Sequence, residues 1–180
     1  MKRKKQILVV EDNLLNREML VEILTEKYSV LEAENGQEAL DVLEQHGDRI
    51  ALILLDVMMP VMDGFAFLDR VKADEDLSLI PVIVMTQSDN ENDEIRALSH
   101  GATDFVPKPY HPQVILHRVA SIIKLRETAA VVNQFQYDRL TGLYSKEFFY
   151  QKVRDCLQEN PDGEYTIVCS NIENSLGYNQ

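Results

Sequence analysis

The stretch Ala51-Leu52-Ile53-Leu54-Leu55-Asp56 decides the fold, because a short apolar run ends on a carboxylate. Ile7-Leu8-Val9-Val10 runs into Glu11-Asp12 in the same way. A third run, Asp104-Phe105-Val106, leads into Pro107-Lys108-Pro109. Short apolar runs that alternate with helix-like segments are typical of buried parallel strands. In such sheets the ligand site lies at the carboxyl ends of the strands, where strand order reverses, so we expect three carboxylates and one lysine at a common edge.

The apolar pattern along the chain predicts five strands that alternate with five helices. The strands are expected at about 6–11, 29–33, 51–56, 81–85 and 103–106. Segments with helical spacing lie between them, at about 14–24, 36–45, 64–71, 89–100 and from Pro112 onward. The first helix has one apolar face, made of Leu14, Met19, Leu20, Ile23 and Leu24. Strict alternation of this kind predicts an α/β fold, a doubly wound parallel sheet with right-handed crossovers.

We expect three parts along the chain: a domain over 1–125, a helical linker over 126–137 and an incomplete second α/β piece over 138–180. Residues 114–137 contain neither proline nor glycine, so the helix near Pro112 is expected to extend through the linker. Apolar residues recur at spacings of three and four, as in a short coiled-coil seam, at Ile122, Leu125, Ala129 and Val132. This extended helix either packs on its own domain or serves dimerisation and signalling, and two heptads leave both interpretations open.

The segment after the linker is expected to hold one helix and one strand. The helix runs from about Lys146 to Gln158, and the turn Asn160-Pro161-Asp162-Gly163 leads into an apolar strand from Tyr165. Cys169 lies within that apolar run, where a small buried side chain is its expected role. With Cys156 it forms neither a zinc spacing nor a disulfide framework, which fits a reducing cytosol.

Composition limits the classes of partner. The 180 residues carry 30 acidic and 18 basic side chains, a net charge of −12, which disfavours binding to nucleic acid or to an anionic membrane. No run approaches the ~20 apolar residues that cross a bilayer. The basic start is followed by only a short apolar stretch and then acids, unlike a signal peptide. We therefore expect a cytoplasmic protein with neither a nucleic-acid nor a membrane partner.

Two neighbouring strand ends should bring Glu11, Asp12 and Asp56 together. Two like charges about 4 Å apart repel by about 4 kcal/mol at an effective dielectric of 20, and a hard cation offsets that repulsion. Mg²⁺ suits a site with few carboxylates because it keeps several waters and also binds phosphate oxygens. Lys108 adds a positive charge for an incoming phosphoryl group, and Thr86 ends another strand with a hydroxyl donor. Taken one at a time, these acids could equally be helix caps or solvated loop ends.

Asp56 is the best candidate for a nucleophile, because Glu11 and Asp12 come as a pair suited to holding a metal ion. An aspartate carboxylate can attack phosphorus and form an aspartyl phosphate. Mg²⁺ and Lys108 would stabilise the charge of the transferring phosphoryl group. The residues themselves therefore predict phosphoryl transfer to Asp56.

Over about residues 5–125 the chain resembles the receiver domain of two-component response regulators. The resemblance rests on Val9-Val10-Glu11-Asp12-Asn13, on LDVMMPVMDG from Leu55 to Gly64, on Thr86 and on Phe105-Val106-Pro107-Lys108-Pro109. It implies a flavodoxin-like five-stranded sheet with strand order 2-1-3-4-5. It also implies that Asp56 accepts phosphate from a phosphohistidine on a sensor histidine kinase or a phosphotransfer protein.

The same resemblance implies a role for each residue of the site. Mg²⁺ would be bound by three side chains and one backbone carbonyl, those of Glu11, Asp12, Asp56 and Met58 respectively. Thr86 would swing toward the phosphate while Phe105 turns inward, which reshapes the face of the fourth helix, fifth strand and fifth helix. The Lys108–Pro109 bond would be cis. Gln87 departs from the family pattern, where a small residue usually follows the switch hydroxyl, and we expect it to change the rate of phosphoryl entry or loss.

The tail resembles the start of a GGDEF domain, the diguanylate cyclase fold. Asp138-Arg139-Leu140-Thr141-Gly142-Leu143-Tyr144, followed by Phe148, looks like the opening motif of that domain. Residues 171–180 fall where the family places its Asp-x-Asp-x-Phe-Lys-x-x-Asn-Asp segment. The corresponding residues here are Asn171 and Glu173 for the metal-binding aspartates, Ser175 and Leu176 for Phe-Lys, and Asn179 for a guanine-contacting asparagine.

The leading hypothesis is a phosphorylation-driven switch, not an enzyme, that controls a GGDEF-like output through the linker helix. We expect it to pair as a homodimer through the face of the fourth helix, fifth strand and fifth helix. A diguanylate cyclase is the alternative for an intact parent protein. This chain lacks the GGDEF signature, and a neutral amide at Asn171 is a poorer Mg²⁺ ligand than a carboxylate. An interaction module that is never phosphorylated is the third hypothesis.

Overall fold

The computed structural model describes residues 4–87, 91–138, 141–166 and 168, with the backbone alone at 87, 91–93 and 133–134. The chain divides into two compact units, Met1–Glu127 and Thr128–Gln180. The first unit holds the sheet, and the second holds the end of a long helix and one further helix.

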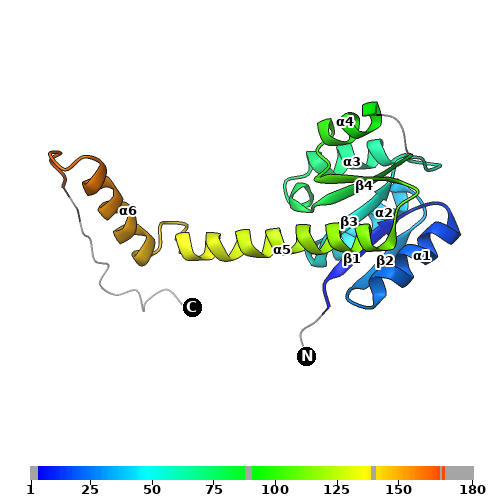
Figure 1. The fold of residues 1–180 in the computed structure, drawn as a ribbon, viewed down its shortest axis with the longest axis horizontal. Coiled ribbons are helices and arrows are strands. Elements are labelled where there is room, and N and C mark those ends of the chain that lie inside the picture. Colours follow the sequence, from blue (N-terminus) through cyan, green and yellow to red (C-terminus); the bar gives the residue numbers. More distant parts are fainter. Residues whose placement is uncertain (1–3, 88–90, 139–140, 167, 169–180) are drawn as a thin grey trace, which may run out of the picture. The chain divides into compact units, whose positions relative to one another are not determined.

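The first unit is built on one parallel sheet of five strands (Figure 1). The strands are β1 Gln6–Val10, β2 Ser29–Ala33, β3 Ile50–Asp56, β4 Val82–Gln87 and β5 Asp104–Lys108. Their order is β2-β1-β3-β4-β5, which confirms the predicted fold class and strand order. Because β1 has β2 on one side and β3 on the other, the strand order reverses at β1, the place where such sheets bind ligands at their carboxyl edge.

Helices alternate with the strands as the apolar pattern predicts. The α-helices of the described residues are α1 Leu14–Thr25, α2 Gly36–His46, α3 Gly64–Ala73, α4 Glu91–Ser99, α5 Pro112–Gln136 and α6 Lys146–Glu159, and the short 3-10 turns are η1 Gly47–Arg49 and η2 Leu77–Leu79. Four helices begin after a side chain that accepts a backbone N–H of the first turn, at Asn13, Asn35, Asp63 and Ser145. In the described part of the chain, no helix combines the length and the apolar character that crossing a bilayer demands.

Helices cover both faces of the sheet. On one face α2, α3 and α4 bury residues such as Leu43, Phe67 and Ala97 against the strands. On the other face α1 and α5 bury Leu24 and Val119. From Leu52 to Leu55 the residues of β3 point alternately into the two cores, so this strand has to be apolar at nearly every position.

The apolar face that was expected on α1 is partly wrong. Leu20 and Leu24 are buried as expected, but Leu14 is 56% exposed and Met19 is 38% exposed. Arg17, only 6% exposed, takes the inward position one turn before Leu20. Positions 17, 20 and 24 follow the helical spacing of three and four, so the helix turns the arginine inward and Leu14 toward solvent.

The second unit has only short-range structure in its described part. Tyr137 and Tyr144 form an isolated antiparallel bridge, with their ring centroids 5.3 Å apart. The strand predicted from Tyr165 is not formed at Tyr165 and Thr166. A strand needs a neighbour for its backbone N–H and C=O groups, and the described residues of this unit offer none there.

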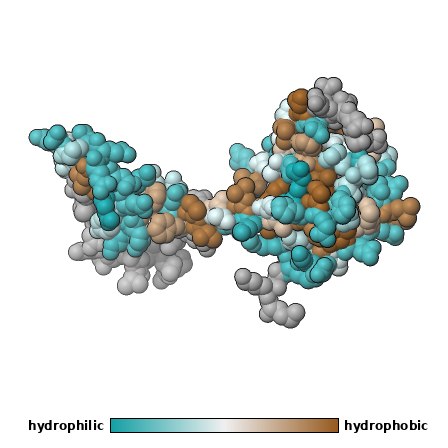
Figure 2. Space-filling model, viewed as in Figure 1, coloured by the Kyte–Doolittle hydropathy of each residue, from teal (hydrophilic) through white to brown (hydrophobic). Residues whose placement is uncertain are grey.

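Several predictions about the tail fall outside the described residues. They concern Arg139 and Leu140 of the opening motif, Cys169, and the positions Asn171, Glu173, Ser175, Leu176 and Asn179. In the described part of the second unit, apolar side chains show at the surface (Figure 2), among them Leu143 at 69% exposure and Tyr150 at 55%.

Candidate metal centre

The ends of β1 and β3 lie side by side at the carboxyl edge of the sheet. Val10 pairs with Leu55 in the parallel register, so Glu11 and Asp56 are the next residues of the two segments. Asp12 follows Glu11 before α1 begins. One carboxylate oxygen from each of the three acids lies within 4.8 Å of the others. The structure thus brings together the three acids that the sequence placed at one edge.

The three acids differ in their access to solvent. Glu11 is 1% exposed and Asp56 is 4% exposed, whereas Asp12 is exposed. The possible metal ligands are therefore hard oxygen atoms, two of them on buried carboxylates and one on a carboxylate that solvent can reach. Mg²⁺ fits such a set, because it binds one or two carboxylates directly and keeps several of its waters.

Lys108 bridges two of the acids from the end of β5. Its Nζ lies 2.8 Å from Oε2 of Glu11 and 2.8 Å from Oδ2 of Asp56, and its side chain is 18% exposed. The following Lys108–Pro109 peptide bond is cis, as the family resemblance implies. One ammonium group therefore supplies the positive charge that holds two buried carboxylates close together.

The surroundings change the protonation of both partners. Burial raises the pKa of Asp56 above its ordinary value; Lys108 opposes this rise, Glu11 adds to it, and the backbone N–H of Met58 lowers the pKa again by donating to the carboxylate. Burial alone would lower the pKa of Lys108, but its hydrogen bonds and charge contacts with Asp56 and Glu11 outweigh that effect and raise it. The lysine therefore stays charged while the aspartate holds its proton more strongly than a solvated one.

The two residues expected to report on phosphorylation lie on β4 and β5. Thr86 is 2% exposed and comes directly after Met85, the register partner of Asp56. Phe105 is half-buried and pairs with Val84. Their switching roles stay predictions; Thr86 lies on β4, the strand next to Asp56, and Phe105 lies on β5, one strand further along the sheet.

Two further predicted residues lie at the rim. Met58 is 66% exposed, and its N–H rather than its carbonyl makes a contact with Asp56, so the metal-binding role of the carbonyl stays a prediction. The backbone of Gln87 ends β4, and the side chain that was expected to influence phosphoryl transfer lies outside the described part of the chain.

The loop after Asp56 packs tightly against it. A Cβ added at Gly64 would lie 2.2 Å from the carbonyl oxygen of Asp56, so only glycine allows the start of α3 to come this close. Val61 has a φ of 67°, in a γ-turn where the N–H of Met62 donates to the carbonyl of Pro60 at 2.7 Å. This conformation is rare for a β-branched residue and shows a loop that is held by its surroundings.

Three residues near the acids were missed by the sequence reasoning. Asn16 donates from Nδ2 to Oε1 of Glu11 at 3.2 Å, and Arg17 donates from Nη1 to the carbonyl of Glu11 at 2.8 Å. Among the described residues the hydroxyl of Tyr110 is buried without a hydrogen-bond partner, and burial together with the charges of Glu11 and Asp56 raises its pKa to about 12. The inward spacing of Arg17 was the one signal available, because neither Asn16 nor Tyr110 stands out in the sequence.

Comparison with known proteins explains this geometry. A family model described as the response regulator receiver domain matches residues 7–120. The chain belongs to the response regulator receiver family. Receiver domains are phosphoacceptors that partner with histidine kinases, and the acidic cluster Glu11, Asp12 and Asp56 is typical of their Mg²⁺ site.

Individual relatives agree with this assignment. The "Probable transcriptional regulator ycf27" of Cyanidium caldarium is 38% identical over 128 residues, which cover 71% of this chain and 49% of that protein. The signal receiver domain of a histidine kinase from Syntrophus aciditrophicus is 38% identical, with a TM-score of 0.62, over 67% of this chain and 90% of that one. A probable two-component system response regulator/GGDEF domain protein is 31% identical, with a TM-score of 0.64, over 68% of this chain and 50% of that one. The chain spans about half the length of the curated relatives it matches.

Proposed function

We propose that this chain is a phosphorylation-driven switch of the cytoplasm, in which Asp56 accepts a phosphoryl group from a phosphohistidine on a sensor histidine kinase or a phosphotransfer protein. One observation carries the proposal: Nζ of Lys108 lies 2.8 Å from both Asp56 and Glu11, inside a cluster of three carboxylates. A preformed positive charge beside a nucleophile suits a reactant that arrives as an anion.

In the proposed step a carboxylate oxygen of Asp56 attacks phosphorus, so that a phosphorus–oxygen bond forms while the phosphorus–nitrogen bond breaks. A proton on the other ring nitrogen lets the imidazole leave as a neutral group. Lys108 then exchanges one of its carboxylate contacts for a phosphoryl oxygen. When bound, Mg²⁺ supplies further positive charge for these oxygens, and we propose that Glu11, Asp12, Asp56 and the carbonyl of Met58 hold it.

The change at Asp56 is proposed to reach the face of α4, β5 and α5 through two side chains. Thr86 is buried directly after Met85, the register partner of Asp56, and we propose that its hydroxyl donates to an added phosphoryl oxygen. Phe105 is half-buried on β5 and would turn inward as Thr86 moves. Because α4 follows β4 and α5 follows β5, both motions alter the same face.

The start of α1 supports a protein partner at this edge. Leu14 and Leu15 are 56% and 75% exposed, and they follow Asp12 by only two and three residues. Exposed apolar side chains rimmed by polar ones are typical of protein contact sites. A kinase or phosphotransfer protein that docks there would bring its phosphohistidine close to Asp56.

Asp56→Asn tests the phosphoacceptor directly. With a small acyl-phosphate donor and Mg²⁺, we expect the wild-type chain to be labelled and the Asp56→Asn variant to lose all labelling, because an amide is no nucleophile toward phosphorus. Asp41→Asn changes an exposed carboxylate of α2 in the same way and should keep full labelling. Undiminished labelling of Asp56→Asn would overturn the proposal, and an unlabelled wild type would favour the interaction module.

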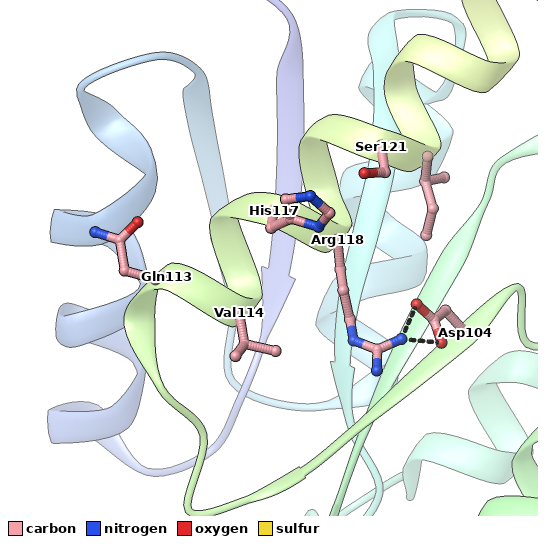
Figure 3. Close-up of a pocket in the computed structure, with 7 residues that line it drawn as sticks. Asp104, Gln113, Val114, His117, Arg118 and Ser121 are labelled. Atoms are coloured by element: carbon pink, nitrogen blue, oxygen red, sulfur yellow. Dashed lines mark hydrogen bonds and ion pairs between the residues drawn. The ribbon is translucent and has the colours of Figure 1, made fainter.

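We further propose that two copies pair through α4, β5 and α5. Ile95 and Leu98 of α4 are 65% and 49% exposed. The next two elements of the chain, β5 and α5, form a hollow of about 510 Å³. It is lined by Asp104, Gln113, Val114, His117, Arg118, Ser121 and Ile122 (Figure 3). Arg118 donates to both carboxylate oxygens of Asp104, at 2.7 and 2.6 Å. This face carries both charges, so it can complement a second copy of itself across a two-fold axis.

Light scattering tests this pairing. With Mg²⁺ alone we expect the mass of a monomer, and with Mg²⁺ and beryllofluoride, which mimics the aspartyl phosphate, the mass of a dimer. Arg118→Asp should prevent the dimer, and adding Asp104→Arg to it should restore the dimer by exchanging the charges. An unchanged mass with the mimic bound would mean that the signal travels within one copy or within a preformed dimer.

We propose that the output is a GGDEF-like domain, which begins directly after the linker part of α5. The carboxylate of Asp138 accepts hydrogen bonds from the N–H and the hydroxyl of Thr141, at 3.0 and 2.8 Å, and Gly142 has a φ of 68°. The described residues of the Asp138–Tyr144 motif thus form a tight turn of their own, which supports a domain start there. Incubation with GTP and Mg²⁺ is expected to yield no cyclic dinucleotide from this chain. Any such product would favour the alternative, a cyclase.

A further inference from the structure

Glu11 is held at three of its atoms by neighbouring side chains. Its Oε1 accepts a hydrogen bond from Nδ2 of Asn16 at 3.2 Å, and its Oε2 accepts one from Nζ of Lys108 at 2.8 Å. Its backbone carbonyl accepts one from Nη1 of Arg17 at 2.8 Å. Both carboxylate oxygens and the carbonyl therefore have fixed directions, which a carboxylate on a loop does not have by itself.

Arg17 reaches Glu11 from a buried position on α1. Its side chain is 7% exposed and pairs with Glu32 at 3.3 Å and with Glu34 at 2.8 Å, at the end of β2. A buried ion pair seldom stabilises a fold more than an apolar residue of similar size, because both charges lose their hydration. An apolar side chain would attach α1 to the sheet, as Leu20 does one turn later. Beyond attaching α1, the arginine provides a hydrogen bond to the backbone carbonyl of Glu11 that no apolar side chain could make.

The side chain of Asn16 does not stabilise α1. Its backbone N–H is satisfied by the capping side chain of Asn13 at 3.1 Å, and this bond does not need the Asn16 side chain. In the described structure the Asn16 amide makes its hydrogen bond to Glu11 and lies half-buried beside it. Asparagine is a weaker helix former than alanine, so α1 is less stable with Asn16 than with alanine there. The residue therefore serves Glu11 rather than the helix.

We propose that Asn16 and Arg17 are positioning residues that hold Glu11 in the orientation that binds Mg²⁺. Oε1 has one other donor, the N–H of Asn13, and at 3.4 Å that contact is long. Without Asn16, Lys108 would still hold Oε2, but Oε1 would lose its shorter donor; without Arg17, the backbone carbonyl of Glu11 would lose the bond that orients the residue. Partners that orient a metal ligand typically change metal affinity by about 10–100-fold. This inference rests on the proposed function, since it takes the three acids as the Mg²⁺ site that serves phosphorylation.

Asn16→Ala is the decisive variant, because it removes the amide donor and at the same time favours the helix. Calorimetric titration with Mg²⁺ alone should give a dissociation constant at least threefold larger than that of the wild type. Labelling by an acyl-phosphate donor should slow at low Mg²⁺ and recover at saturating Mg²⁺, while the free energy of unfolding stays equal or rises. Met19→Ala, an uncharged change on the outer side of α1, is the matched control and should leave the dissociation constant unchanged.

Arg17→Lys tests the second positioning residue. Lysine keeps the positive charge but replaces the branched guanidinium by one ammonium group, which cannot reach Glu32, Glu34 and the carbonyl of Glu11 together. We expect the Mg²⁺ dissociation constant to rise three- to tenfold in protein that circular dichroism shows to be folded. Should this variant fail to fold, Asn16→Ala still decides the proposal.

Two failures can be told apart. Unchanged Mg²⁺ dissociation constants in both folded variants would overturn the positioning role and leave Arg17 as a structural link between α1 and β2. A wild-type chain that binds no Mg²⁺ or takes up no phosphate would overturn the proposed function itself. A loss of stability in Asn16→Ala with unchanged Mg²⁺ binding would likewise count against the proposal.

Discussion

The two units of the chain are held together in different ways. In Met1–Glu127, side chains pack on both faces of the sheet, and every strand contributes buried residues. In the described part of Thr128–Gln180 no residue is buried, and Phe149, Tyr150 and Leu157 of α6 are 40%, 55% and 46% exposed. The described contacts of the second unit are short-range, such as the ring contact of Tyr137 with Tyr144 at 5.3 Å and the bond from the hydroxyl of Ser145 to the carbonyl of Phe135 at 2.6 Å.

The difference shows which interactions the two units depend on. A hydrogen bond exchanged with water contributes about 0.5–1.5 kcal/mol, whereas full burial of one leucine side chain contributes about 1.5–3 kcal/mol. The first unit therefore depends on contacts between residues far apart in the chain. The second depends on caps and turns that its own local sequence specifies, and it leaves apolar side chains available for other surfaces.

Matched leucine substitutions test this comparison most strongly. Leu54→Ala removes a fully buried side chain of β3 and should lower the free energy of unfolding by about 3 kcal/mol. Leu157→Ala removes a half-exposed side chain of α6 and should lower it by less than about 0.5 kcal/mol. Urea denaturation followed by circular dichroism measures both. Equal losses would mean that the second unit has a core of its own and would break the comparison.

Two glycines extend the test to the backbone. An added Cβ at Gly64 would meet the Asp56 carbonyl at 2.2 Å, so Gly64→Ala should cost about 2 kcal/mol in urea denaturation and slow the labelling of Asp56. At Gly142, with a φ of 68°, an added Cβ meets nothing within 4 Å. Gly142→Ala should therefore lower the local stability of this turn by about 1 kcal/mol, the penalty of a left-handed conformation for a residue with a Cβ. Amide exchange over residues 136–146 detects that loss, and slower exchange there would contradict it.

In the acidic cluster, burial of a charged carboxylate lowers the stability of the first unit. Burial raises the pKa of Asp56 above its ordinary 3.8, so the folded chain keeps this proton to higher pH than the unfolded chain. The stability that Asp56 contributes is complete below pH 3.8 and is lost as pH rises through the folded value. In EDTA at neutral pH, Asp56→Asn should therefore raise the free energy of unfolding, because it removes the desolvation cost of a buried charge.

Mg²⁺ should reverse this ranking. A cation that binds only the folded wild type stabilises it by mass action, and the variant has lost one ligand. Urea denaturation should therefore show Asp56→Asn as the more stable protein in EDTA and the wild type as the more stable protein in Mg²⁺. A destabilised Asp56→Asn in EDTA would show that the Lys108 bridge outweighs the cost of burying the acid.

Tyr110 offers a smaller test of the same kind. Its buried hydroxyl has no partner among the described residues, so Tyr110→Phe should raise the free energy of unfolding by up to about 1 kcal/mol at neutral pH. Its pKa is raised from 10.0 to about 12, so its contribution is complete below pH 10 and is lost as pH rises toward 12. Between pH 8 and pH 12, the free energy of unfolding measured by urea denaturation should therefore fall less steeply for the variant than for the wild type. Parallel curves would show that another group causes the wild-type loss.

The sheet and the acidic edge were predictable because their signals are local. A strand buried on both faces has to be apolar throughout, so the run from Ala51 to Leu55 is visible without any partner. Parallel strands end at one edge, so residues after such runs meet there whatever the loops do. This is why Glu11, Asp56 and Lys108 were placed together correctly although 97 positions separate the first from the last.

Features that depend on distant partners were not predictable. On α1, Leu14 and Met19 are apolar like Leu20, but the inward position of Arg17 goes with its ion pairs to Glu32 in β2 and Glu34 just after it. The strand expected from Tyr165 fits its own sequence, but a strand forms only where another one lies alongside. The burial of Tyr110 likewise results from packing against the core of α1 and α5, which the sequence near it does not encode.

Counted by formal charge, three carboxylates and one ammonium group give the cluster two net negative charges. One divalent cation makes the site electrically neutral, whereas a monovalent ion leaves an unbalanced charge in a buried place and a trivalent ion reverses the sign. We therefore expect valence to select the ion before its radius does. Electroneutrality also sets an order of events, because a doubly negative phosphoryl group meets no net repulsion only after the cation has bound.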